Sequence, residues 1–136
     1  MKPLRLILSS IGLLLAGACA TPPPQTVSVA EVVSHPAERA LVDGLRDYEN
    51  GAFEPAAKDF HVALERGLRD PRDTAVAYKH LAFIDCAFNR LADCERNFRS
   101  AFAADPGFRL SESEIGHPIW GPVYRRVAAE KGKSGS

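Results

Sequence analysis

"GLRDYENGAFEPAAKDFHVAL" (Gly44–Leu64) is followed, at an offset of 38 residues, by a similar stretch, "AFIDCAFNRLADCERNFRSAF" (Ala82–Phe102). The two stretches agree in acidic, aromatic and small residues. The identical pairs are Asp47 with Asp85, Phe60 with Phe98, and Ala63 with Ala101. Internal repeats of roughly 20 to 50 residues are typical of stacked helical arrays. The sequence therefore predicts an all-α fold that contains two helical hairpins.

Both copies resemble the tetratricopeptide repeat, a helical hairpin in which small and aromatic residues recur at fixed spacing. In the first copy the matching residues are Gly44, Tyr48, Gly51, Phe53, Ala56, Phe60 and Ala63. In the second copy they are Ala82, Asn89, Leu91, Cys94, Phe98, Ala101 and Pro106. The resemblance implies that residues 36–108 form two such repeats. Their offset exceeds the family's period of about 34 residues because "RGLRDPRD" makes a longer loop between them.

Proline, glycine and acidic residues mark the expected helix ends. Pro36 lies where the first helix begins, since a proline is tolerated at the first helical position, where its missing N–H has no partner in any case. Gly51 is expected to open the turn between the first two helices. Asp73 or Thr74 is expected to cap the N-terminus of the third helix.

Asp47 and Asp85 occupy a position at which the repeat usually has a large apolar residue. We expect each aspartate to form a partly exposed salt bridge to the facing helix, with Lys58 and Arg96 as the partners. A role of the two aspartates in binding is the alternative.

Cys86 and Cys94 are placed opposite each other across the second hairpin, with four residues of helix on either side of a turn near Arg90. Their counterparts in the first copy are Tyr48 and Ala56, so both members of a large–small packed pair are replaced together. This correlated change favours a disulfide over two idle thiols. A disulfide that closes so short a loop contributes about 2.5 kcal/mol in the chain-entropy model.

Residues 109–131 are expected to cover the open end of the second hairpin. Ser111 and Glu114 have the spacing of a capping box, which starts a short turn. Gly121-Pro122 can then restart a helix. The apolar residues on one side of this helix are Val123, Tyr124 and Val127. Residues 132–136 are polar and are expected to form a frayed tail.

Trp120 lies between two prolines, in a loop rather than on a helix face. One interpretation is that it fills the exposed groove of the last hairpin. The alternative is that it anchors a partner protein together with Arg125 and Arg126, because Trp and Arg are enriched at interface hot spots.

"LLLAGACATPPP" (Leu13–Pro24) ends an apolar run at a cysteine and continues into prolines. The run is about 13 residues long, whereas roughly 20 are needed to cross a bilayer as a helix. Residues 1–18 therefore have the form of a secretory signal peptide. The small residues before Cys19 resemble the bacterial lipobox, although Ala16 stands where Leu is usual. An ordinary signal peptide, cut nearby and leaving a stray thiol, is the alternative.

The lipobox resemblance implies that Cys19 becomes the lipidated N-terminus, with the covalent lipid as the only attached group and no cofactor. Residues 19–35 then form a flexible, proline-rich tether, which is extended and semi-rigid where prolines follow one another. Residue 20 is Ala rather than Asp. In a bacterium with two membranes this favours an outer-membrane lipoprotein whose globular part lies in the periplasm, an oxidising compartment.

Composition indicates a binding protein rather than an enzyme. Lys plus Arg and Asp plus Glu both total 17, so no charge excess points to nucleic acid. The four histidines are scattered, without a pair at the spacing of metal ligands. Neither a phosphate-binding glycine loop nor a CxxC motif is present. We therefore expect no catalytic residue, no metal and no small-molecule substrate.

Tetratricopeptide arrays usually bind peptides along a groove lined by the first helix of each pair. The residues that this resemblance places in the groove are Leu41, Leu45, Tyr48, Lys79 and Phe83. The alternative is that the chain's own ends cover this apolar strip.

A lipobox, the hairpin "HLAFIDCAFNRLADC" and the tail "GHPIWGPVYRRV" together resemble small lipoproteins associated with type VI secretion systems. The resemblance implies an accessory scaffold or adaptor at the secretion apparatus, anchored by its lipid and bound to a protein of the cell envelope. Two alternatives remain: a pilotin-like escort of an outer-membrane secretin, and a periplasmic activator or regulator of a cell-wall enzyme.

Overall fold

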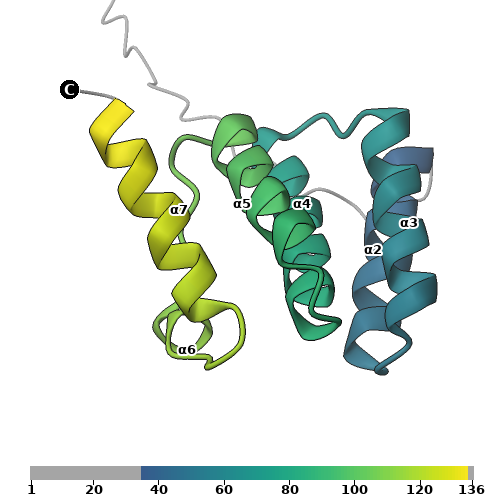
Figure 1. Ribbon diagram of the computed structural model, residues 1–136. Coiled ribbons are helices and arrows are strands. Elements are labelled where there is room, and N and C mark those ends of the chain that lie inside the picture. Colours follow the sequence, from purple (N-terminus) through teal and green to yellow (C-terminus); the bar gives the residue numbers. More distant parts are fainter. Residues whose placement is uncertain (1–34, 135–136) are drawn as a thin grey trace, which may run out of the picture.

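A computed structural model describes residues 35–134, whose regular secondary structure is entirely α-helical (Figure 1). The helices are α2 (Pro36–Glu49), α3 (Phe53–Arg66), α4 (Pro71–Ala87), α5 (Leu91–Ala104), the short α6 (Glu112–Ile115) and α7 (Gly121–Ser134). The predicted all-α class is confirmed. The predicted signal peptide, Cys19 and all of the predicted tether except residue 35 lie outside the described residues.

The helices form two antiparallel pairs and a C-terminal cover (Figure 1). Helix α2 packs along α3, α4 packs along α5, and α3 joins the two pairs through α4. On the other side α7 packs against α5. The turns within the pairs and α6 lie at one end of the molecule, whereas the start of α2 and the end of α7 lie at the opposite end (Figure 1).

Helices α2 and α3 approach closely at Gly44. A Cβ atom on Gly44 would lie 2.9 Å from two ring carbons of Phe60 and 3.2 Å from the carbonyl oxygen of Ala56. Carbon atoms normally make contact at about 3.5–4.0 Å, so only glycine fits this position. The small residue at position 44 therefore lets the Phe60 ring pack directly against the backbone of α2.

The predicted start of the first helix and the predicted turn after it are confirmed, but the predicted start of the third helix is wrong. Pro36 occupies the first turn of α2, and Gly51 has φ +76° in the turn that follows. Helix α4 begins at Pro71, and the Asp70 side chain accepts a hydrogen bond from the Arg72 N–H at 2.9 Å. An N-cap aspartate directly before a proline starts the helix here, before the expected Asp73 or Thr74.

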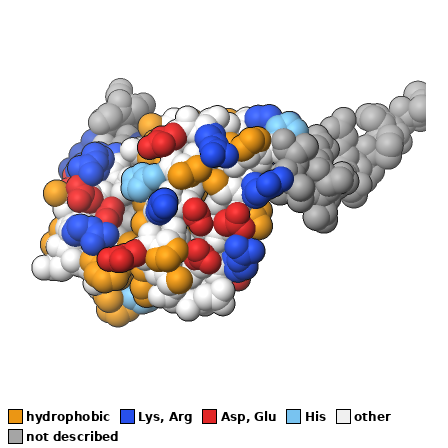
Figure 2. All heavy atoms as spheres, turned by 90° about the vertical axis from the view of Figure 1, so that its right-hand side faces the viewer, with side chains coloured by type: hydrophobic (Ala, Val, Ile, Leu, Met, Phe, Trp, Pro, Cys, Tyr) orange, Lys and Arg blue, Asp and Glu red, His pale blue; other side chains and the backbone are white. Residues whose placement is uncertain are grey.

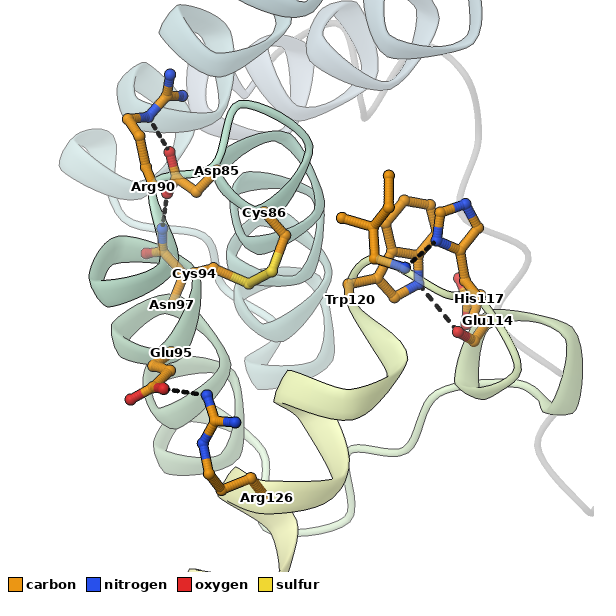
Figure 3. The surroundings of a disulfide bond; sticks show 11 residues. Asp85, Cys86, Arg90, Cys94, Glu95, Asn97, Glu114, His117, Trp120 and Arg126 are labelled. Atoms are coloured by element: carbon orange, nitrogen blue, oxygen red, sulfur yellow. Dashed lines mark hydrogen bonds and ion pairs between the residues drawn. A yellow bond between two sulfur atoms is a disulfide. The ribbon is translucent and has the colours of Figure 1, made fainter.

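The expected partners of the two repeat aspartates are also wrong. Asp85 accepts hydrogen bonds from Arg90 and from the side-chain amide of Asn97, at 2.8 and 2.7 Å (Figure 3). Arg96 instead pairs with Asp93, one turn away on its own helix. Among the described residues, no ion pair joins Asp47 to Lys58.

The repeat offset explains why the two aspartates differ. Position 97 corresponds to Asp59 in the first hairpin, and a carboxylate cannot donate the hydrogen bond that Asn97 gives to Asp85. Position 90 corresponds to Ala52, which has no charged group. The bonding network around Asp85 is therefore specific to the second hairpin.

The cover formed by the C-terminal segment has the predicted local structure. The Ser111 side chain accepts a hydrogen bond from the Glu114 N–H, and the Glu114 side chain accepts one from the Ser111 N–H, which completes the capping box. Val123, Tyr124 and Val127 of α7 are buried in one core cluster with Phe98 and Phe102 of α5. Helix α7 continues to Ser134, past the expected boundary at residue 131.

The predicted disulfide is present between Cys86 and Cys94, which join α4 to α5 (Figure 3). Their Cα atoms are 5.2 Å apart, and both residues are buried. The bond closes the turn of the second hairpin at the point where the first hairpin has Tyr48 and Ala56.

Reduction of this disulfide should lower the free energy of unfolding by about 2.5 kcal/mol, because the unfolded chain regains the entropy of a loop between cysteines eight residues apart. Urea unfolding with and without dithiothreitol measures the difference. The variant Cys86→Ala/Cys94→Ala serves as the control, and its stability should not respond to the reductant. Equal stability of the wild type in both conditions would contradict the prediction.

Candidate protein-binding groove

A groove of about 730 Å³ runs between α2 and the beginning of α4. Its lining residues are Glu38, Leu41, Val42, Leu45, Arg69, Asp70, Pro71 and Asp73. Leu41 is buried, whereas the Val42 side chain next to it is 49% exposed. The groove therefore has an aliphatic wall on α2 and a charged rim, which is formed by Glu38 at the start of α2, the α3–α4 loop and the first turn of α4.

Two of the five predicted groove residues, Leu41 and Leu45, line this groove. Tyr48 is partly buried where the two hairpins meet, and its ring makes edge contacts with Phe53 and His80. The structure therefore does not join all five positions into one continuous exposed strip.

The other two predicted groove residues, Lys79 and Phe83, are covered by the C-terminal segment. Lys79 Nζ forms an ion pair with Glu114 at 2.7 Å, and both side chains are largely buried. The Trp120 ring stacks on the Phe83 ring, with 4.3 Å between the centroids. The interpretation of Trp120 as a filler of the last hairpin's groove is thus confirmed.

Trp120 is held from several directions. Its indole N–H donates to the carbonyl oxygen of Glu114 at 2.9 Å, and its ring also stacks on His117 (Figure 3). The backbone N–H of Ile119 donates to Nδ1 of His117 at 3.3 Å. A role of Trp120 as a partner anchor stays a prediction.

Of the two tail arginines, Arg126 holds the C-terminal segment to α5, whereas Arg125 bonds within that segment. Arg126 pairs with Glu95 of α5 (Figure 3), and Arg125 donates to the carbonyl oxygen of Ile115 at 2.8 Å. The hydrogen bond from Arg126 lowers the pKa of the Glu95 carboxyl. Both arginines therefore have an intramolecular role, and their binding to a partner stays a prediction.

The charged rim of the groove is incompletely neutralised. Glu38 pairs with Arg69 at 2.9 Å, and Asp70 pairs with Arg72 at 2.7 Å. Asp73 is partly buried, and none of the ion pairs or hydrogen bonds in residues 35–134 includes its carboxylate. Burial raises the pKa of Asp73, and the charges of Asp70 and Glu38 raise it further.

Sequence reasoning missed Val42 and the charged rim. The available signal was the dipeptide Asp70-Pro71, which marks the start of α4 and so places Asp73 in its first turn, facing α2. No pattern in the sequence indicated that the α3–α4 loop would border the groove.

His80 lies between the two hairpins and was also missed. Its ring is 4.9 Å from Tyr48, 5.3 Å from Phe60 and 5.9 Å from Phe83, measured between centroids. Nδ1 of His80 is 2.8 Å from the carbonyl oxygen of Val76, so the proton of the neutral ring lies on Nδ1. Burial lowers the pKa of His80 to about 4. The imidazole therefore packs as a neutral ring at neutral pH.

Two further findings concern the chemistry of residues 35–134. Within this range, no three His, Cys, Asp or Glu side chains are grouped so that they could hold a metal ion. None of the described helices has the length and apolar character needed to cross a membrane.

Acidification should destabilise the protein through His80. Its pKa is lower in the folded than in the unfolded state, so stability is complete above the unfolded value near 6.5 and decreases as the pH falls. We expect a loss of about 2 kcal/mol between about pH 7.5 and pH 5, above the range in which carboxylates take up protons. Urea unfolding at a series of pH values tests this. In His80→Phe the free energy of unfolding should depend less on pH. His61→Gln, on the exposed side of α3, is the control and should leave this pH dependence unchanged. An equally steep pH dependence in His80→Phe would refute the assignment to His80.

Loss of the Phe83 ring should release Trp120. We expect Phe83→Ala to cost about 3 kcal/mol, as is common for buried aromatic residues, and to shift tryptophan emission to longer wavelength. Trp120 is the single tryptophan of the chain, so the emission reports on this site alone. Phe53→Ala is the control, because this ring is 36% exposed and contacts Tyr48 and Phe88 rather than Trp120. An unchanged emission spectrum in Phe83→Ala would contradict the stacking.

Two surfaces suggest a function: the groove between α2 and α4, and the positions Lys79 and Phe83 on α4 that the C-terminal segment covers. Comparison of the chain with protein-family models, with curated proteins and with solved structures finds no match.

Proposed function

We propose that this protein is a lipid-anchored, periplasm-facing scaffold or adaptor of the tetratricopeptide type, which acts by binding a partner protein in the groove between α2 and α4. The observation that carries the proposal is an equivalence between the two hairpins. The offset of 38 residues relates Leu41 to Lys79 and Leu45 to Phe83. The second pair is covered by the chain's own Glu114 and Trp120, whereas the first pair lines the groove.

The equivalence supports binding because the C-terminal segment already uses the second hairpin as a docking surface. It contributes one ring that stacks on an apolar position and one carboxylate that pairs with a cation. The first hairpin presents the same two backbone positions with leucine side chains. A segment of another protein can occupy them in the same manner, through apolar contacts along α2.

Packing within the hairpins supports the tetratricopeptide assignment. The close approach at Gly44 and the full burial of Ala56, Phe60 and Phe98 agree with the roles of the small and aromatic residues in that repeat. The proposed anchor rests on Cys19 and its preceding small residues, and the outer membrane on Ala20.

An accessory role in a type VI secretion apparatus rests on the resemblance of the cysteine hairpin and the tail. In this chain the disulfide stabilises that hairpin, and the tail supplies Trp120 and Arg126, which hold the C-terminal cover in place. The two parts of the resemblance are therefore in contact in this chain, since Trp120 stacks on the cysteine hairpin at Phe83 and Arg126 pairs with it at Glu95.

A photoreactive amino acid at Val42, introduced into the full-length protein in intact cells, tests the proposal. Val42 lies in the groove and is 49% exposed. A matched probe at His61, exposed on α3, is the control position. We expect one partner to be captured from position 42 at least tenfold more than from position 61. Leu45→Glu should reduce this capture about tenfold, because it places a charge on the aliphatic wall; a tenfold change corresponds to about 1.4 kcal/mol.

Mass spectrometry of the captured protein distinguishes the candidate roles. Subunits of a secretion apparatus support the accessory role. A secretin supports the escort alternative, and a peptidoglycan synthase or hydrolase supports the regulator alternative. Equal capture from both positions, or none from position 42, would refute the groove as the binding surface.

A further inference from the structure

We propose that the groove between α2 and α4 selects a basic amphipathic segment of its partner, with aliphatic side chains on Leu41, Val42 and Leu45 and a Lys or Arg side chain beside Asp73. This inference rests on the proposed function and adds the chemistry of the partner. Three observations lead to it: the shape of the wall, the charge of the rim, and the composition of the competing segments.

The wall of the groove requires an apolar ligand face. Leu41 and Leu45 are four residues apart and therefore lie on the same side of α2, with Val42 beside them. Val42 is one of the few large apolar side chains with about half of its surface exposed. Contact with aliphatic side chains would remove this surface from water.

The rim of the groove requires a cation. It presents three carboxylates, from Glu38, Asp70 and Asp73, and one cation, from Arg69. Arg69 pairs with Glu38, and Asp70 pairs with Arg72. The carboxylate of Asp73 therefore has no ion pair of its own beside two other acidic groups, and the charge of Arg72, which pairs with Asp70, offsets it only in part. A bound Lys or Arg would supply the missing charge, in a site where partial burial strengthens the attraction.

The α2–α3 face of the molecule as a whole carries acidic and basic side chains interspersed with apolar ones (Figure 2). A basic ligand is therefore favoured by the residues that line the groove and not by a uniformly acidic surface.

Two segments of the chain itself compete for the role of occupant. Residues 20–35 read ATPPPQTVSVAEVVSH, contain neither Lys nor Arg, and include Glu31. They would bring a further negative charge to the rim. The basic C-terminal residue Lys131 already contacts its own chain, through the carbonyl oxygen of Pro106 and the ring of Phe102. Charge complementarity therefore favours a separate partner over both segments.

The first experiment adds charge variants to the capture from position 42 in intact cells. Asp73→Lys should reduce capture at least tenfold, and Asp73→Asn should reduce it by a smaller factor. Asp59→Lys, which makes the same charge change on α3 at a position outside the groove lining, should leave capture unchanged. Thermal unfolding of each variant confirms that it folds.

The second experiment uses peptides and the purified protein. The probes are a synthetic amphipathic peptide with leucines four residues apart and lysines beside them, and the same peptide with glutamate in place of lysine. The lysine peptide should bind at least tenfold more tightly in fluorescence polarisation, and its affinity should fall as salt is added. With Asp73→Lys the preference should reverse.

Several results would overturn the inference while leaving the proposed function intact. In one, Leu45→Glu abolishes capture but Asp73→Lys does not. In another, the crosslinked segment of the partner contains neither Lys nor Arg, or the glutamate peptide binds as tightly as the lysine peptide. Capture of residues 20–34 of the same chain or of a second copy also overturns it. Capture that resists Leu45→Glu as well refutes the proposed function itself.

Discussion

A helical hairpin buries one face between its own two helices and leaves a second face that the next unit of the chain must cover. Everything else in this structure depends on that requirement, because two hairpins are fewer than the three or more repeats that such arrays normally need. Between the two hairpins, aromatic side chains cover this face: His80 contacts Tyr48 and Phe60 of the first hairpin and Phe83 of its own helix. On the outer side of the second hairpin, α7 covers the corresponding face, and its apolar residues pack against α5. The disulfide adds stability where the array is too short to supply it.

The C-terminal segment that covers the second hairpin also determines which part of the groove stays open. The segment that leads from α5 to α7 passes over the first helix of the second hairpin, where Glu114 pairs with Lys79 and Trp120 stacks on Phe83. The same residues that complete the fold therefore remove half of the surface that a longer array would offer to a ligand. Helix α2 has no hairpin before it in the described chain, and its aliphatic residues line the remaining groove. The position of the candidate site follows from how the fold is closed rather than from a separate binding motif.

Local patterns in the sequence were sufficient for the fold. The repeat offset located both hairpins, the paired change at positions 86 and 94 identified the disulfide, and the Ser111–Glu114 spacing identified the capping box. Each of these patterns involves residues within one hairpin or one turn, or a direct comparison of the two hairpins. The partners of Asp85 were missed because both donors, Arg90 and Asn97, reach it across the turn of the hairpin, and the sequence pattern does not show which side chains come within bonding distance. Only two of the five predicted groove residues line the groove, for a related reason. Periodicity shows which face of α4 points inward, but it does not show that Trp120 will cover that face.

Docking on α4 and docking on α2 differ in their entropic cost, and this difference makes the charged rim of the groove important. Glu114 and Trp120 belong to the same chain as Lys79 and Phe83, so their docking has no cost of bringing two molecules together. A separate partner on α2 loses translational and rotational freedom, which the apolar contacts must offset before any affinity appears. Aliphatic contacts alone also discriminate weakly between partners, since one methylene group is worth only about 1–3 kcal/mol. An unpaired, partly buried carboxylate penalises the approach of another negative charge and attracts a positive one, which increases both selectivity and the rate of encounter. In the proposed complex, Asp73 would thus provide a discrimination that Leu41, Val42 and Leu45 cannot supply by themselves.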